Sequence, residues 1–290
     1  MSICNICPRA CGADRSRRGG FCASPEEAAV SRVSLHMWEE PPISGERGSG
    51  TIFFSGCNLR CVFCQNKAIS RGDSEAKIYD AAALSELFMS VEEMGAHNIN
   101  LVTPTHFIIT VARALEQTKH RLSIPVVYNS SGYEKLSSLK LLDGLVDVYL
   151  PDFKYASAEL ADKYSSAPDY PEVAKAALSE MYRQTGAVSF DDAKMIRRGM
   201  IVRHLVLPSH RKDSIAALDT LAKLLPIKDI RLSLMSQYTP EFAMDCEFKE
   251  LHRRVTSFEY NSTLDHALSL GFEGYFQHRS SASASYTPDF

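Results

Sequence analysis

Three cysteines lie close together in the segment SGCNLRCVFCQN, at positions 57, 61 and 64. Their spacing is C-x3-C-x2-C, and they follow directly on a short apolar run, TIFFS, at 51–55. Three neighbouring thiolates can ligate three irons of a [4Fe-4S] cubane and leave the fourth iron open, whereas a structural cluster or zinc site normally closes with a fourth ligand. The incomplete ligand set favours a catalytic iron-sulfur site at Cys57, Cys61 and Cys64.

An open iron can chelate the amino and carboxylate groups of S-adenosylmethionine (SAM). One-electron transfer from a low-potential cluster then breaks a carbon-sulfur bond to give a 5′-deoxyadenosyl radical, and the protein binds, orients and shields the cofactors. Phe63 is predicted either to lie against the adenine or to fill the core, and Asn58 and Gln65 to donate hydrogen bonds near sulfur. The alternative is a zinc or iron-sulfur protein without catalysis, which serves electron transfer or assembly.

A second group of cysteines opens the chain, at Cys4, Cys7, Cys11 and Cys22, in the spacing C-x2-C-x3-C-x10-C. Four thiolates make a closed set, which suits either a structural zinc ion or an auxiliary iron-sulfur cluster. Gly19 and Gly20 would let the chain fold back to deliver the fourth ligand. The last cysteine, Cys246, stands alone and is expected to be a small buried side chain.

Composition narrows the class of protein. The net charge of -3 over 290 residues provides no general basic field, which argues against binding of nucleic acid through phosphates. The absence of a signal core or of about 20 consecutive apolar residues argues against a membrane location. We therefore expect a cytoplasmic protein whose eight cysteines are kept reduced for metal chemistry. The arginines near the start, Arg9, Arg15, Arg17 and Arg18, are expected to be solvated.

The elements that must position these residues alternate between strand and helix patterns. Apolar side chains recur at three- and four-residue intervals in 81–95 and 108–120, and a last helix is expected at 259–270. Repeated β-α units predict a parallel sheet, closed or partly closed into a barrel or else doubly wound, with the active site at the C-terminal strand ends. The six predicted strands are 51–55, 98–103, 124–129, 146–152, 200–207 and 229–235.

The sequence pattern divides the chain into three parts. Residues 1–48 are predicted to form an irregular, Cys-rich N-terminal extension, residues 49–277 the α/β core, and residues 278–290 a polar tail that we expect to be loosely held.

Several motifs together resemble the radical SAM superfamily, and within it the PflX family, named for its similarity to pyruvate formate-lyase activating enzymes. The resemblance covers about residues 4–277. It rests on the cysteine loop and on HNINLVTPTHF (97–107), VVYNSSGYE (126–134), VDVYLPDFKY (146–155), EMYRQTG (180–186), IVRHLVLP (201–208) and SLMSQYTP (233–240). It implies a partial (β/α)6 TIM-type barrel, with SAM lying across the C-terminal strand ends.

The resemblance also implies which residues meet SAM. They are Thr103, Pro104, Thr105, Asn129, Ser130, Ser131, Asp152, Lys154, Arg203, His204, Gln237 and Tyr238. Two departures stand out. Thr103 to Thr105 occupy the place where many radical SAM enzymes have Gly-Gly-Glu, so that no carboxylate is available there. Asn129 and Tyr238 stand where related activating enzymes place Asp and His near a monovalent cation, so we do not predict that cation.

The activity implied is hydrogen abstraction from a partner, a glycyl-radical enzyme or another protein, with flavodoxin or ferredoxin as the electron donor. The alternatives are abstraction from a small molecule or short peptide, and the non-catalytic metal protein described above.

Overall fold

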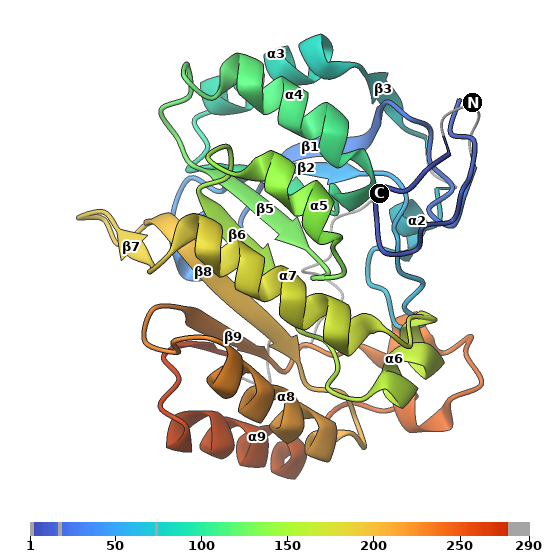
Figure 1. Cartoon of the computed structure of the whole chain (residues 1–290). Coiled ribbons are helices and arrows are strands. Elements are labelled where there is room, and N and C mark those ends of the chain that lie inside the picture. The colour runs from blue at the N-terminus through green and yellow to red at the C-terminus, as the bar shows by residue number, and fades with distance from the viewer. Residues whose placement is uncertain (1–2, 17–18, 73–74, 278–290) are drawn as a thin grey trace.

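A curved, mainly parallel sheet forms the centre of the protein, and helices wrap around its outer side (Figure 1). The computed structural model describes residues 3–16, 19–72 and 75–277. All six predicted strands are present, and they pair in parallel in chain order. They are β2 (Ser49–Phe54), β4 (Ile99–Val102), β5 (Val126–Ser130), β6 (Val148–Pro151), β8 (Ile196–Leu205) and β9 (Arg231–Met235).

Further strands extend the sheet at both edges, and the sheet is not closed. β10 (Gly274–Phe276) pairs in parallel with β9, and the short β7 (Ser189–Phe190) is antiparallel to β8. On the other side, β1 (Ala28–His36) is antiparallel to both β2 and β3 (Lys77–Tyr79). The prediction that residues 1–48 are irregular is therefore wrong for β1. Only the first three residues of β1 are buried, so its sequence carries a weak strand signal.

The helices that the sequence pattern predicts cover the outer face of the sheet. Local signals set their starts: the Asp80 side chain accepts a hydrogen bond from the backbone N–H of Ala83, and Thr256 and Glu259 form a capping box. The predicted segments 81–95, 108–120 and 259–270 correspond to α3, α4 and α9. The outer helices are α3 (Ala81–Glu93), α4 (Ile108–Thr118), α5 (Leu136–Leu139), α6 (Ala158–Ser165), α7 (Tyr170–Thr185), α8 (Arg211–Leu224) and α9 (Ser257–Ser269).

A short helix, α1 (Pro41–Ser44), packs inside the sheet. Pro41 suits the first helical position because its fixed φ is already helical, and Gly45 ends the helix at a φ of 49°. Ile43 is fully buried against Val127, Val148 and other aliphatic residues of the inner face. Because this helix follows β1, whose last residue pairs with Ser49 at the start of β2, it closes the interior at the end away from the cysteine loop.

No helix in the described parts of the chain combines the length and the apolar character needed to span a membrane. Arg17, Arg18 and the polar tail at 278–290 lie outside the described residues.

Ile43→Ala is expected to destabilise the protein by about 2–5 kcal/mol, because it leaves a cavity in an apolar interior that cannot collapse freely. The matched control is Ile109→Ala, since Ile109 is 38% exposed on α4. The midpoint of thermal unfolding should fall for the first variant and stay near the wild-type value for the second. Equal midpoints for both variants would contradict the assigned role of α1.

Candidate active site

The predicted cluster loop connects β2 to α2 (Lys67–Ser70) at the C-terminal end of the strand. Burial raises the pKa of the Cys57 thiol, and the neighbouring Cys61 and Cys64 raise it further. Burial followed by the effect of Cys61 also raises the pKa of Cys64. The three sulfurs therefore lie close enough to interact. Among the described residues no three His, Cys, Asp or Glu side chains gather around a single ion position, but each thiolate of a cubane binds a different iron.

Each of these sulfurs has a hydrogen-bond partner. The Leu59 N–H donates to Cys57 Sγ at 3.4 Å, Ser165 Oγ donates to Cys61 Sγ at 3.0 Å, and the Ser70 side chain bonds Cys64. Such bonds stabilise thiolate ligands. Three thiolates with donors already in place are the kind of ligand set that a [4Fe-4S] cluster requires, so the loop fits this group.

The donors predicted for sulfur are used elsewhere. Asn58 Nδ2 donates to the carbonyl of Tyr133 at 2.7 Å, and Gln65 Nε2 donates to the carbonyl of Gln237 at 3.2 Å. Ser165, which donates the hydrogen bond to Cys61, lies 104 residues from it in the sequence, so no local pattern could have identified it.

A chain of alternating charges leads from the cluster loop into the sheet interior. Lys154 Nζ lies 2.5 Å from Asp152 Oδ2, and Arg203 Nε lies 3.1 Å from Asp152 Oδ1. Burial alone would raise the pKa of Asp152, but Lys154 and Arg203 hold it below the ordinary value. Burial would lower the pKa of Lys154, but Asp152 and Cys61 raise it. Lys154 is therefore a half-buried cation that interacts with both a carboxylate and a cysteine of the cluster loop.

Two acidic residues that the sequence analysis missed reach the same interior. The Glu39 carboxylate accepts hydrogen bonds from Asn100 Nδ2 at 3.0 Å and Asn129 Nδ2 at 3.2 Å, and lies 3.3 Å from Arg203 Nη1. Glu40 is only 8% exposed, its Oε2 has no partner among the described residues, and burial raises its pKa. Both come from the segment before α1, which had been assigned to an irregular extension.

The polar residues at the ends of β4 and β5 form hydrogen bonds either with the backbone or with the carboxyl group of Glu134. Thr103 has a φ of 59°, a strained conformation for threonine, and its N–H donates to the carbonyl of Asn129 at 2.8 Å. Thr105 Oγ1 donates to Glu134 Oε1 at 2.5 Å, and the buried Ser130 also bonds Glu134. Ser131, half-buried, accepts a hydrogen bond from the N–H of Tyr133 at 3.5 Å. The hydroxyls of Thr105 and Ser130 are thus directed to a carboxyl group that the sequence analysis had not singled out.

The remaining predicted residues lie around the loop or behind the sheet. The buried Phe63 packs edge-on against Tyr238, with ring centroids 6.0 Å apart. Gln237 Oε1 accepts a hydrogen bond from Gln277 at 2.9 Å. His204 is buried, its Nδ1 lies 2.6 Å from the carbonyl of Phe153, and burial lowers its pKa.

Comparison with known proteins decides the family. Residues 51–186 match the model of the Radical SAM superfamily. The chain is also 30% identical over 271 residues to the uncharacterized protein MJ0674 of Methanocaldococcus jannaschii, covering 90% of this chain and 73% of that protein. The chain belongs to the radical SAM superfamily. The match to the superfamily model includes the cysteine loop, Asp152 and Lys154.

A solved structure of a radical SAM protein shows the same fold. A radical SAM methyltransferase from Sphaerobacter thermophilus superposes with a TM-score of 0.51 at 15% identity, over 78% of this chain and 65% of that one. SuiB of Streptococcus suis bound to S-adenosylmethionine gives a TM-score of 0.49 at 13% identity, over 79% of this chain and 47% of that one. This chain thus spans less than two thirds of either protein.

Membership of the radical SAM superfamily implies a [4Fe-4S] cluster and SAM as cofactors. Cys57, Cys61 and Cys64 would hold the cluster, which supplies the electron that cleaves SAM when both are bound. The residues of this chain would provide the ligands, and they provide the hydrogen bonds to the sulfurs and the half-buried charges beside them.

The N-terminal cysteines form a second neighbourhood of thiols. Burial raises the pKa of Cys7 to about 11, with Cys22 and Cys4 raising it further. Burial also acts to raise the pKa of Cys11, but hydrogen bonds from the backbone of Ala13 and the side chain of Cys4, among others, lower it below the ordinary value. The four thiols therefore interact pairwise within one turn-rich segment.

This segment is docked on the cluster loop. Arg9 Nε donates to the carbonyl of Asn58 at 2.8 Å, and Arg15 Nη1 donates to the carbonyl of His106 at 2.6 Å. The prediction that these arginines are solvated is wrong for both, because each satisfies buried backbone carbonyls. Gly56 has a φ of 82°, and a Cβ there would lie 2.4 Å from the carbonyl oxygen of Cys22. The two cysteine segments meet at this backbone contact.

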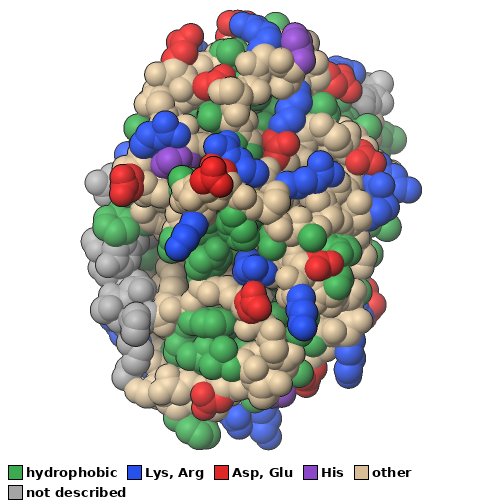
Figure 2. Space-filling view, turned by 90° about the vertical axis from the view of Figure 1, so that its left-hand side faces the viewer, with side chains coloured by type: hydrophobic (Ala, Val, Ile, Leu, Met, Phe, Trp, Pro, Cys, Tyr) green, Lys and Arg blue, Asp and Glu red, His purple; other side chains and the backbone are tan. Residues whose placement is uncertain are grey.

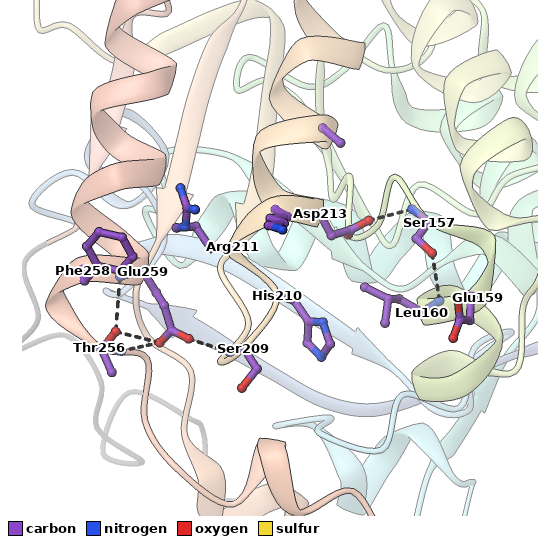
Figure 3. Close-up of a pocket in the computed structure, with 12 residues that line it drawn as sticks. Ser157, Glu159, Leu160, Ser209, His210, Arg211, Asp213, Thr256, Phe258 and Glu259 are labelled. Carbon is purple, nitrogen blue, oxygen red and sulfur yellow. Dashed lines mark hydrogen bonds between the residues drawn. The ribbon is translucent and has the colours of Figure 1, made fainter.

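Among the described residues, further hollows lie outside the candidate site, and two of them exceed 700 Å³. One, of about 710 Å³, lies at the N-terminal ends of α6, α8 and α9 (Figure 3). Acidic side chains of this chain bind backbone groups beside two of these helix starts: the N–H of Ser157 donates to Asp213, and the N–H of Ser209 donates to Glu259.

The other hollow, of about 770 Å³, lies beside α1 and is lined by Pro41, Met195 and Tyr275 among others, with Arg47 and Lys194. On the face shown in Figure 2, hydrophobic side chains gather near the middle, with Lys and Arg side chains around them.

Glu134→Gln should remove a pH dependence of stability. Burial raises the pKa of Glu134 from 4.5 to about 8. The folded protein therefore keeps a proton that the unfolded chain releases, and stability falls as pH rises between these two values. The slope is at most about 1.4 kcal/mol per pH unit. Thermal midpoints measured at about pH 5.5 and about pH 7.5 should differ more in the wild type than in the variant.

The control for this comparison is Glu180→Gln. Hydrogen bonding to Arg183 lowers the pKa of Glu180 to about 2, so its titration lies below this pH range. A wild-type slope that survives in Glu134→Gln would contradict the assignment.

Proposed function

We propose that this radical SAM enzyme abstracts a hydrogen atom from a protein partner, in the manner of the glycyl-radical-enzyme activators that the PflX-like motifs resemble. The observation that carries the radical chemistry is the set of three cysteine sulfurs, each with a hydrogen-bond partner, beside the half-buried cation of Lys154. The preference for a protein partner rests on the motifs alone. A low-potential donor such as flavodoxin or ferredoxin would supply the electron.

The chain's own residues would share the remaining tasks. SAM carries an ammonium, a carboxylate and a sulfonium, and the interior offers complementary charges at Lys154, Asp152 and Arg203. We assign SAM contacts to these residues and to Phe63, Thr103, Asn129, Ser131 and Gln237. Thr105, Ser130 and His204 are buried and bonded within the protein, which favours a supporting role behind the same strand ends.

The first test is SAM cleavage. Anaerobic, reduced protein should form 5′-deoxyadenosine, and replacing Cys57, Cys61 and Cys64 together by Ala should abolish product, because the cluster loses every protein ligand. Cys246→Ala is the matched thiol control and should keep activity, since Cys246 lies outside the loop. Product from the triple variant at the wild-type rate would remove the site assignment, and none from the intact protein would favour a non-catalytic metal protein.

The partner is tested with the same reduced enzyme. Incubation with SAM and each glycyl-radical enzyme of the source organism should give a glycyl signal in electron paramagnetic resonance with one of them. If none gives a signal while 5′-deoxyadenosine still forms, the substrate is instead a small molecule or peptide.

We further propose that Cys4, Cys7, Cys11 and Cys22 hold a second metal centre, zinc or an auxiliary iron-sulfur cluster. The mutual effects of Cys4, Cys7 and Cys22 on pKa show that these thiols lie near one another, and backbone groups bond Cys11. Among the described residues no three of them surround a single ion position, so the four thiols would have to move together around a metal. Replacing all four by Ser should remove metal beyond that of one [4Fe-4S] cluster, measured by elemental analysis, and should leave the cluster signal of the loop. Unchanged metal content would exclude the second centre, and X-ray absorption at the iron and zinc edges identifies the metal.

A further inference from the structure

The end of α6 supplies a hydrogen bond to the cluster loop from outside it. Ser165 is the last residue of α6 and is fully buried, and its Oγ lies 3.0 Å from Cys61 Sγ. The hydroxyl of Tyr155, which is also fully buried, lies 2.8 Å from Ser165 Oγ. Because Ser165 gives its one hydroxyl proton to sulfur, Tyr155 is the donor in this second bond. The two bonds form a chain from tyrosine to serine to sulfur.

The position of Ser165 is fixed from two sides. The N–H of Val62, in the cluster loop, donates to the carbonyl of Tyr164 at 2.9 Å. Arg9 spans the gap from the N-terminal segment, because its Nη2 donates to the carbonyl of Ser165 at 3.1 Å while its Nε binds that of Asn58. The backbone at Ser165 is therefore held against the cluster loop from both sides.

The effect of such a bond on an iron-sulfur cluster has a definite sign. Reduction adds negative charge to the cluster and its thiolates, and a proton donor aimed at sulfur stabilises that charge, so the bond raises the reduction potential. The effect is largest where water is excluded and where a second bond polarises the donor, as Tyr155 does here. The donor to Cys57, a backbone N–H at 3.4 Å, is longer.

We propose that Ser165 is a positioning residue that sets the reduction potential of the cluster through Cys61, with Tyr155 reinforcing the bond. The proposal rests on the assignment of the cluster to Cys57, Cys61 and Cys64. It places a determinant of redox behaviour on α6, outside the cysteine loop and outside every motif that defines the loop.

The test is an anaerobic potentiometric titration of the full-length, cluster-loaded protein, followed by electron paramagnetic resonance of the reduced cluster. Ser165→Ala should lower the ratio of reduced to oxidised cluster about tenfold at a fixed potential, which is a downward shift of about 59 mV for one electron. Tyr155→Phe should shift the midpoint in the same direction by less. It nearly preserves the volume of the side chain, so it also serves if Ser165→Ala does not fold.

The matched control is Ser49→Ala. Ser49 is a fully buried serine whose hydroxyl donates to Asn98 Oδ1 at 2.7 Å, at the opposite end of β2, and its replacement should leave the midpoint unchanged. A midpoint in Ser165→Ala or Tyr155→Phe that equals or exceeds the wild-type value, with full iron content, overturns the proposal. Failure of this proposal can be told apart from failure of the proposed function. In the second case the wild-type protein shows no reducible cluster, or the triple Cys variant retains the cluster.

Discussion

Gathering three half-buried thiols at the end of one strand is the constraint on which the rest of the structure depends. Desolvation disfavours the thiolate, as the raised pKa of Cys57 shows, yet only the thiolate binds iron. The protein offsets this cost with the charge of Lys154 and with a hydrogen bond to each sulfur. Metal uptake must release the remaining protons, so occupancy of the loop is coupled both to pH and to folding.

Inside the sheet, away from the loop, charged side chains are likewise offset by partners of opposite charge. Arg203, on β8, forms ion pairs with Asp152 and with Glu39, which lies in the segment before α1. Glu39 also accepts hydrogen bonds from Asn100 on β4 and Asn129 on β5. Segments that are far apart in the sequence are thus held together by one set of half-buried charges. Removing one member would leave its partners partly desolvated and unpaired, which costs more than the net contribution of an intact pair.

A feature of this structure could be predicted from the sequence when the residues that define it lie close together in the chain. The six parallel strands were predicted correctly because short β-branched runs between helical repeats are local patterns. The cysteine loop could be proposed as a cluster site because its three cysteines lie within eight residues, and its role as the ligand set stays a prediction. Strand β1 was missed because it lies beside Cys- and Arg-rich sequence and alternates weakly. Glu39, Glu134 and Ser165 were missed because their importance lies in contacts with distant segments, which no spacing records. Arg9 and Arg15 were placed in solvent for the same reason.

The close approach at Gly56 means that the two cysteine segments are not separable modules. With a Cβ at this position, the backbone of Cys22 would be displaced, and the Ser24 side chain with it. Whatever machinery delivers metal to the loop therefore meets a surface shared with the N-terminal segment. The order in which the two segments fold therefore affects the surface that the loop presents, and a fusion partner attached at the N-terminus would be tethered to that surface.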